Sequence, residues 1–293
     1  MRSFSEMLAY MEENGVNLLE AILENEAAEL ECSTDHVLQG MADRLETMRR
    51  SMDDGTRKEM HPKIVELDAP KMRRYRMERD PLSGSISARA SEIALSISTC
   101  NSSMGRVVAA PTAGSCGMLP GVLFSWEEHQ NPEGNLLSEG LTVAAFIGQI
   151  IAERATLAGA EGGCQAECGA AGAMAAGALV WMEGGSADQV FQAAALTLKS
   201  ILGLVCDPVA GLVEVPCIKR NGMLVSLAFM AADMALAGIR SVIPVDEVVD
   251  SLYEVGRSLP PSLRETGRGG VAATSTGKAI AAKLRESAPS LEG

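Results

Sequence analysis

Apolar residues recur every three or four positions along most of the chain, which is the spacing of amphipathic helices. The pattern is clearest from Thr34 to Met52, and the run Asp53, Asp54 and Gly55 ends it. Period-two alternation, which would indicate strands, is rare. The pattern therefore predicts a mainly α fold.

Cap residues divide the start of the chain into short helices. Ser3 with Glu6 and Asn17 with Glu20 have the spacing of a capping box, and Gly15 is suited to end the first helix. The first 55 residues are therefore expected to form a small helical unit.

Eight further helices are predicted beyond this unit. They span residues 85–99, 119–129, 137–157, 168–182, 186–203, 221–238, 245–259 and 276–286. Gly- and Pro-rich connectors separate them at residues 109–121, 159–163, 207–217 and 267–270. Glycine in such connectors lets the backbone approach a ligand closely.

The segment between residues 56 and 80 differs in composition from both neighbours. It contains Pro62 and Pro70 and a dense basic run, so it is expected to be a linker or a lid. The basic residues of the run are Lys71, Arg73, Arg74, Arg76 and Arg79. A solvated helix face explains such a run better than an anion site does. The expected organisation is a helical unit at 1–55, a charged linker or lid at 56–80, and one helical domain at 81–293.

Composition limits the function further. The 293 residues are 47% hydrophobic but 3% aromatic, with 29 Gly and 16 Met, so Ala, Leu, Val, Ile and Met must build the core. The net charge of −13 opposes a nucleic acid or an anionic membrane as the main partner. The longest uncharged apolar stretch, residues 168–182, is shorter than the ~20 residues of a membrane span. With no signal-like start, a cytoplasmic protein that binds a small molecule is expected.

Seven cysteines, an odd number without dense spacing, argue against a disulfide framework. Cys164, Cys206 and Cys217 each lie beside a turn residue or a connector, where backbone N–H groups can reach a thiolate. They are too far apart in sequence for a zinc ribbon, and spacing alone also allows three packed small hydrophobic residues.

Three sequence motifs are specific, and two of them contain these cysteines. They are AAPTAGSCG at residues 109–117, GCQAE at 163–167 and CDPVAGLVEVPCIKRN at 206–221. Shorter words are LSGS at 82–85, NSSMG at 101–105 and ETGRGG at 265–270, continuing through Gly277. Through these motifs the chain resembles the alpha chain of iron–sulfur-dependent L-serine dehydratase, and the similarity covers most of its length.

The resemblance implies an enzyme, a carbon–oxygen lyase, whose catalytic domain at 81–293 surrounds a 4Fe–4S cluster held by Cys164, Cys206 and Cys217. One iron without a cysteine ligand would act as a Lewis acid on the hydroxyl and carboxylate of L-serine. Elimination of water gives an enamine, which becomes pyruvate and ammonia, a step of amino-acid degradation that can feed gluconeogenesis. No pyridoxal cofactor is implied.

Several residues are candidates for substrate contact. Asn101, Ser103, Thr112 and Gly114 offer an amide, hydroxyls and backbone donors suited to a carboxylate, although such residues are also common in ordinary turns. Lys278, and with less support Arg268, are candidate carboxylate partners. His36, His61 and His129 are isolated and are expected at the surface, so the sequence assigns no general base. Cys32, Cys100, Cys116 and Cys168 are expected to be packed thiols, with Cys116 nearest the site.

The chain departs from the family pattern at a few positions. A Gly-Gly pair is replaced by Glu66 and Leu67, an acidic residue by Thr99, and a proline by Ser275. The family's second part, with a Ser-Ser-His-Thr word, is absent from these residues, so a separate beta subunit is implied. The chain printed here finishes Ser290 to Gly293 without a cysteine, so self-blocking of the open iron is not expected.

Two alternatives remain open at this point. The chain could act on another beta-substituted amino acid, such as cysteine or threonine, because Glu66, Leu67 and Thr99 differ from the pattern. It could instead be a non-catalytic helical subunit that holds a cluster or zinc at the same thiols.

Overall fold

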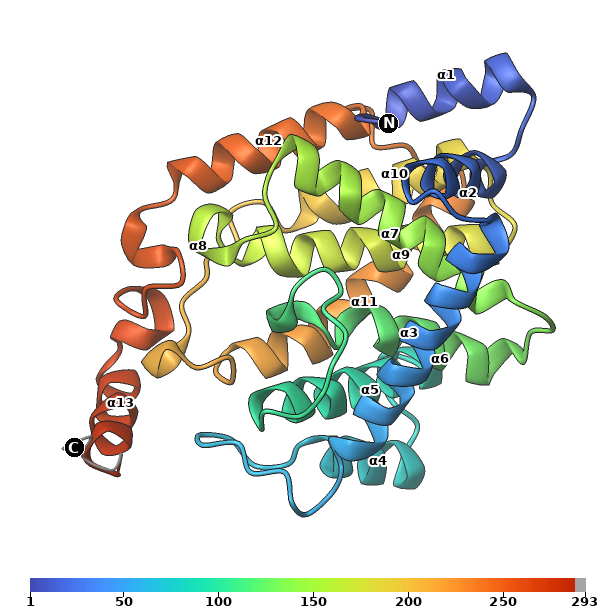
Figure 1. Ribbon diagram of the computed structural model, residues 1–293. Coiled ribbons are helices and arrows are strands. Elements are labelled where there is room, and N and C mark those ends of the chain that lie inside the picture. The colour runs from blue at the N-terminus through green and yellow to red at the C-terminus, as the bar shows by residue number, and fades with distance from the viewer. Residues whose placement is uncertain (288–293) are drawn as a thin grey trace.

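The computed structural model describes residues 1–287, and in this part of the chain it is mainly α, as predicted (Figure 1). It contains thirteen α-helices and no strand within the described residues. The first seven are α1 (Phe4–Asn14), α2 (Leu18–Glu29), α3 (Thr34–Asp54), α4 (Ala69–Glu78), α5 (Ser85–Ser102), α6 (Met118–Gln130) and α7 (Leu136–Arg154). The others are α8 (Gly159–Gly162), α9 (Ala170–Met182), α10 (Ala187–Ser200), α11 (Cys217–Leu236), α12 (Val245–Ser258) and α13 (Ser275–Ser287).

Helix α9 is the centre of the molecule. It packs against α6, α7, α10 and α11, which surround it on every side (Figure 1). Twelve of its thirteen residues are buried, because its sequence consists almost entirely of Ala, Gly and larger apolar residues. The expected core helix at 168–182 is therefore confirmed, except that its first turn is a π-helix, Gln165–Gly169.

Small residues allow the helices around α9 to approach closely. A Cβ atom added to Gly177 of α9 would lie 2.2 Å from Cδ1 of Ile147 on α7, inside van der Waals contact. The scarcity of aromatic residues fits this arrangement, since wide side chains would push the helices apart.

Helix α7 is long and apolar enough, by length and composition, to cross a membrane. In this structure 67% of its most apolar window is buried inside the protein, against α9, α3 and α2. Such burial is typical of a core helix.

The chain start is tied to the main body by aromatic packing and a carboxylate. The Phe4 ring lies 4.9 Å from the Phe191 ring and 6.0 Å from the Phe146 ring, between centroids. Asp246 of α12 accepts hydrogen bonds from the backbone N–H groups of Phe4 and Ser5 at 3.1 and 3.0 Å. Ser3 and Gly15 cap α1, and Asn17 with Glu20 forms the predicted capping box of α2.

The segment at 56–80 contains helix α4, which the sequence did not predict. α4 packs on α5, and Arg73, Arg74 and Arg79 point to solvent, as expected for a solvated face. The backbone before α4 is held by Glu214, whose buried carboxylate accepts hydrogen bonds from the N–H groups of residues 63–65 at 2.7–3.2 Å. The proposed domain boundaries at 55 and 80 stay a prediction.

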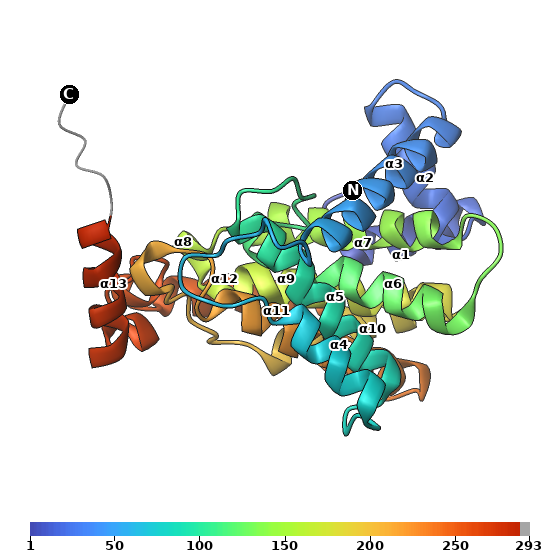
Figure 2. The ribbon, with the colours of Figure 1, turned by 90° about the horizontal axis from the view of Figure 1, so that it is seen from below.

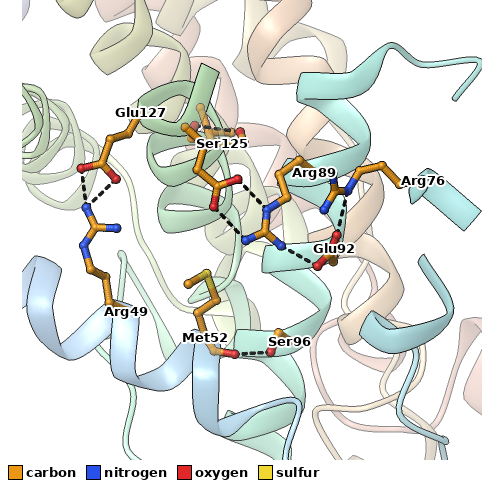
Figure 3. A network of polar contacts seen from close by, with 10 residues as sticks. Arg49, Met52, Arg76, Arg89, Glu92, Ser96, Ser125 and Glu127 are labelled. Carbon is orange, nitrogen blue, oxygen red and sulfur yellow. Dashed lines mark hydrogen bonds and ion pairs between the residues drawn. The ribbon is translucent and has the colours of Figure 1, made fainter. Parts of the chain in front are cut away.

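Ion pairs connect α3, α4, α5 and α6 along one side of the molecule (Figure 3). Arg89 of α5 makes a bidentate pair with Glu128 of α6, with both distances at 2.8 Å. Glu92, which is 5% exposed, accepts from Arg76 of α4 at 2.9 Å and also pairs with Arg89. Arg49 of α3 pairs with Glu127 of α6. These charges fix the helices that flank the loop after α5.

Helices α8 and α13 lie at one end of the molecule, and α1 to α3 lie toward the other (Figure 2). α13 contacts the short 3-10 turns Val209–Gly211 and Gly270–Ala273. The expectation about a terminal cysteine concerns residues 288–293, which lie outside the described part of the chain.

Asn221, near the start of α11, joins two connectors that are far apart in sequence. Its side-chain N–H group donates to the carbonyl oxygens of Gly114 and Cys217 at 2.8 and 3.0 Å, and its oxygen accepts from the N–H of Gly117 at 3.1 Å. The residue is 0% exposed, so water cannot replace these bonds. Asn221 therefore sets the position of the 112–117 loop relative to the first turn of α11.

Replacing Asn221 by Ala is expected to lower the free energy of unfolding by about 2–4 kcal/mol, because three buried backbone groups lose their partner. Chemical denaturation measures this change. Asn14→Ala is the matched control. The Asn14 side chain also donates a hydrogen bond to a backbone carbonyl, that of Tyr10, but it is exposed. An equal decrease in the free energy of unfolding of the two variants would contradict this structural role of Asn221.

Candidate functional site

Three segments bring Cys164, Cys206 and Cys217 into one buried region. Cys164 precedes the π-helical turn, Cys206 lies in an extended segment paired with Arg264, and Cys217 is the first residue of α11. The three residues are 3%, 3% and 9% exposed. We call this region the thiol site and define it by these cysteines together with Glu167.

The backbone on both sides of Cys206 is fixed by the segment at 263–265. The Cys206 N–H donates to the Leu263 carbonyl at 2.9 Å, and its carbonyl accepts from the Glu265 N–H at 2.7 Å. These bonds occupy the backbone N–H and carbonyl of Cys206. Its thiol contacts Glu167 within the thiol site.

Asp207 ties the same segment to α11 and to the loop before α13. Its carboxylate accepts from Arg220 at 2.8 Å and from the Val271 N–H at 2.7 Å, and Arg220 also donates to the Val205 carbonyl at 2.7 Å. Gly270, at a φ of +54°, passes so close that an added Cβ would lie 2.1 Å from the carboxylate. Glycine is required there both by conformation and by space.

The electrostatics of the thiols follow from burial and from their mutual proximity. Burial raises the pKa of Cys217 to about 12, and negative charge on Cys164 and Glu167 adds to the rise. Burial and the charges of Cys164 and Glu167 likewise raise the pKa of Cys206. The Cys168 sulfur, 3.3 Å from that of Cys164, lowers the pKa of Cys164, and Arg220 contributes. A cationic partner would be needed to hold all three as thiolates at neutral pH.

Glu167 places a carboxylate among the thiols. Its Oε1 accepts a hydrogen bond from the Thr112 hydroxyl at 2.8 Å, and its Oε2 lies 3.9 Å from the Cys206 sulfur, which donates to it. Burial raises the pKa of the Glu167 carboxyl, the Thr112 hydroxyl lowers it, and the charge of Glu265 raises it further. The thiol site thus carries acidic groups from three segments.

Two of the substrate candidates, Thr112 and Gly114, lie at the thiol site. Gly114 approaches the Glu167 carboxylate, and its carbonyl is held by Asn221. The Asn101 side chain instead donates to the Ala113 carbonyl at 3.0 Å, so it stabilises the loop internally. The Ser103 hydroxyl is buried and has no hydrogen-bond partner within residues 1–287.

Lys278 lies in a different place from Thr112 and Gly114. Together with Arg268 it lines a cavity of about 1040 Å³ between α13 and the loop that connects Cys206 with Cys217. The lining that the structure describes contains four basic side chains and no acidic one; the basic residues are Lys63, Arg268, Lys278 and Arg285. The cavity therefore attracts anions to the outer side of this loop.

The histidines lie where the sequence placed them, but two cysteines differ from expectation: Cys168, rather than Cys116, adjoins Cys164, with 3.3 Å between the sulfur atoms, and Cys32 is not fully packed. Cys100, Cys116 and Cys168 are buried in the core, and Cys32 is half-buried. His36, His61 and His129 are all exposed, in agreement with a surface role.

Within residues 1–287 no three His, Cys, Asp or Glu side chains are close enough together to ligate a single metal ion. A 4Fe–4S cluster requires a wider arrangement, because its thiolates bind different iron atoms. Soft sulfur donors in a buried setting suit such a cluster better than they suit Ca²⁺ or Mg²⁺.

Sequence reasoning missed the roles of Glu167, Asp207, Arg220 and Asn221. All four lie in the sequence motifs that contain Cys164, Cys206 and Cys217. Asn221 gave one usable signal, since it follows Cys217 by one helical turn and so shares a face with it. Glu167 gave no such signal, because the residues around its carboxylate, Thr112 and Cys206, lie far from it in the sequence.

The departures from the family pattern lie apart from the thiol site. Glu66 is exposed and pairs with Lys71 at the surface, and the buried Thr99 hydroxyl donates to the Leu95 carbonyl of its own helix. Ser275 begins α13. None of these side chains contacts Glu167 or the three cysteines through a hydrogen bond.

Comparison with known proteins gives a consistent assignment. The profile of the serine dehydratase alpha chain matches residues 13–272. A probable L-serine dehydratase alpha chain of Bacillus subtilis is 42% identical over 284 residues, 97% of this chain and 95% of the relative.

Two further relatives extend the comparison. The L-serine dehydratase alpha chain of Peptoniphilus asaccharolyticus is 41% identical over 94% of this chain and 95% of its own length. L-serine dehydratase 1 of Escherichia coli is 36% identical over 92% of this chain, but only 61% of that longer protein is covered. This chain belongs to the serine dehydratase alpha chain family, a family of enzymes.

Proposed function

We propose that this chain is the alpha subunit of an L-serine ammonia-lyase that converts L-serine to pyruvate and ammonia, with a 4Fe–4S cluster held by Cys164, Cys206 and Cys217. The observation that carries the proposal is the approach of these three thiols from distant segments, next to a loop that offers polar groups to a small ligand. Family membership supports the same reaction.

The thiol site fits the cluster by its chemistry. Three buried thiols stand without a disulfide, and burial alone would keep Cys206 and Cys217 protonated. A cationic iron–sulfur core offsets this effect, as metals do for coordinating thiols. When bound, the cluster supplies a Lewis acid at the iron that has no cysteine ligand.

The chain's own residues would position the substrate and the thiols. Asp207 and Arg220 hold the backbone of Cys206, and Asn221 holds the 112–117 loop against α11. Thr112 and Gly114 lie at the site, while Asn101 stabilises the loop behind them. Lys278, in the basic cavity, is proposed to attract the substrate carboxylate.

A separate beta subunit is proposed as the partner. The relatives of similar length are named alpha chains, whereas the Escherichia coli relative has a much longer chain. The proposed partner would supply the region that the longer Escherichia coli relative has beyond the matched part, and would complete the site. A cytoplasmic location belongs to the same proposal.

Cys206→Ser is expected to abolish cluster binding, since it removes one of three thiolates. Anaerobically purified wild type should contain about four iron and four acid-labile sulfide per chain, and the variant much less. Cys32→Ser, which changes a half-buried thiol outside the site, should match wild type. Zinc in place of iron in the wild type, or full iron in the Cys206 variant, would contradict the ligand assignment.

The anaerobic complex with its beta subunit is expected to release pyruvate from L-serine faster than it releases 2-oxobutyrate from threonine or sulfide from cysteine. Assays of the three products on one preparation measure this preference. A higher rate with threonine or cysteine would identify a relative with another substrate. A full cluster without any elimination would identify a non-catalytic subunit.

Lys278→Met is expected to raise the KM for L-serine by about three- to tenfold with little change in kcat, because an attractive charge is lost before the chemical step. Steady-state kinetics at low salt measure the effect. Lys283→Met is the matched control, an exposed lysine of the same helix that does not line the cavity. An equal change in the KM for L-serine in the two variants would contradict a role of Lys278 in attracting the substrate.

A further inference from the structure

Glu167 is the acidic side chain that lies among the three cysteines. It follows Cys164 by one turn and accepts a hydrogen bond from Thr112, while its second oxygen lies 3.9 Å from the Cys206 sulfur. The carboxylate is partly open to solvent rather than sealed in the core. A small ligand bound at the thiol site would therefore meet it.

Two glycines let separate loops approach this carboxylate closely. A Cβ atom on Gly114 would lie 2.8 Å from Oε1, and one on Gly159 would lie 2.6 Å from Oε2. Any other residue at either position would press on the carboxylate. Two loops from different parts of the chain thus pack against the same side chain and hold it between them.

The Glu167 carboxylate has no cationic partner among residues 1–287. No described Lys, Arg or His lies within ion-pair distance of it, and Arg220 is bound to Asp207. Two fully buried carboxylates nearby do have partners: Asp207 binds Arg220 and a backbone N–H, and Glu214 binds three backbone N–H groups. An ionised carboxylate accepts up to about four hydrogen bonds, so Glu167 has capacity left for a ligand.

The proposed substrate carries the matching group. An α-amino acid at neutral pH has an ammonium group with three N–H donors, and a partly buried site must neutralise that charge to bind it. The hydroxyl and carboxylate of L-serine are suited to a Lewis acid and to cationic side chains, which leaves the ammonium without a partner.

We propose that the Glu167 carboxylate binds the α-ammonium group of the amino-acid substrate, with Thr112 orienting the carboxylate and the close approach of Gly114 and Gly159 fixing its position. This inference rests on the proposed function of the chain. It makes Glu167 the residue that distinguishes amino acids from hydroxy acids without an amino group.

The test compares two ligands that differ by the amino group. L-Serine and 3-hydroxypropionate share the hydroxyl and the carboxylate, but only L-serine has the ammonium. In the anaerobic complex with the beta subunit, Glu167→Gln is expected to raise the KM for L-serine by at least about tenfold, the loss typical of a charge-assisted hydrogen bond. The inhibition constant of 3-hydroxypropionate, and its dissociation constant from titration of the cluster absorption, should change less than about twofold.

Two further variants separate binding from structure. Glu167→Asp keeps the charge and should recover part of the affinity lost in the Gln variant. Glu161→Gln changes an exposed carboxylate in the neighbouring segment, which accepts from Thr156, and should behave as wild type. Iron and sulfide content of all variants should equal that of wild type.

Equal weakening of L-serine and 3-hydroxypropionate, or loss of iron in Glu167→Gln, would overturn the inference and assign Glu167 to support of Cys206. An unchanged KM for L-serine would also overturn it. These outcomes are differences between the variants and the wild type. Failure of the proposed function would instead be seen in the wild type itself, which would lack the cluster or would not convert L-serine.

Discussion

The thiol site depends on one buried amide. Asn221 binds the Gly114 carbonyl, the Gly117 N–H and the Cys217 carbonyl, so a single side chain fixes the 112–117 loop to the first turn of α11. Without it, Thr112 and Gly114 would have no fixed relation to Cys217. Asp207 has the corresponding role on the other side, where it joins the Cys206 segment to Arg220 and Val271. Both residues are nearly inaccessible to water, which makes each of their hydrogen bonds costly to break.

The small residues of the core explain why the site lies where it does. Helix α9 is enclosed by four helices at close distance, and the π-helical turn that follows Cys164 leads directly into it. The turn therefore has a rigid support on its C-terminal side, while Gln165 fixes it to α12 and to Gly203 through bonds of 2.8 Å. π-Helical turns often occur at functional positions, because they re-aim side chains within a regular helix. Here the turn carries Glu167 and Cys168, and Cys164 precedes it.

Much of the fold was predictable from the sequence, because apolar stripes and caps are local signals. The helices after residue 80 lie close to their predicted ranges, except that the single turn α8 (Gly159–Gly162) lies in a predicted connector. Ser3, Gly15 and Asn17 cap the helices they were expected to cap. Helix α4 was missed because its sequence, Ala69–Glu78, is rich in charge and has no strong apolar stripe. The start of α11 was placed too late, since Pro216 and Cys217 resemble the end of the preceding connector. The roles of Glu167 and Asn221 come from contacts across long sequence separations, which no single-sequence pattern contains.

The proposed reaction depends on three thiols meeting at one cluster, beside a carboxylate proposed to face the substrate. Resemblance to the family supplied the cysteines, and the structure adds the bonds that hold their segments and the unpaired Glu167. The most direct test is anomalous diffraction at the iron edge from crystals of the anaerobic complex. We expect iron density within bonding distance of the sulfur atoms of Cys164, Cys206 and Cys217, with one iron free of cysteine. Iron bound elsewhere, or bound without one of these three sulfur atoms, would contradict it.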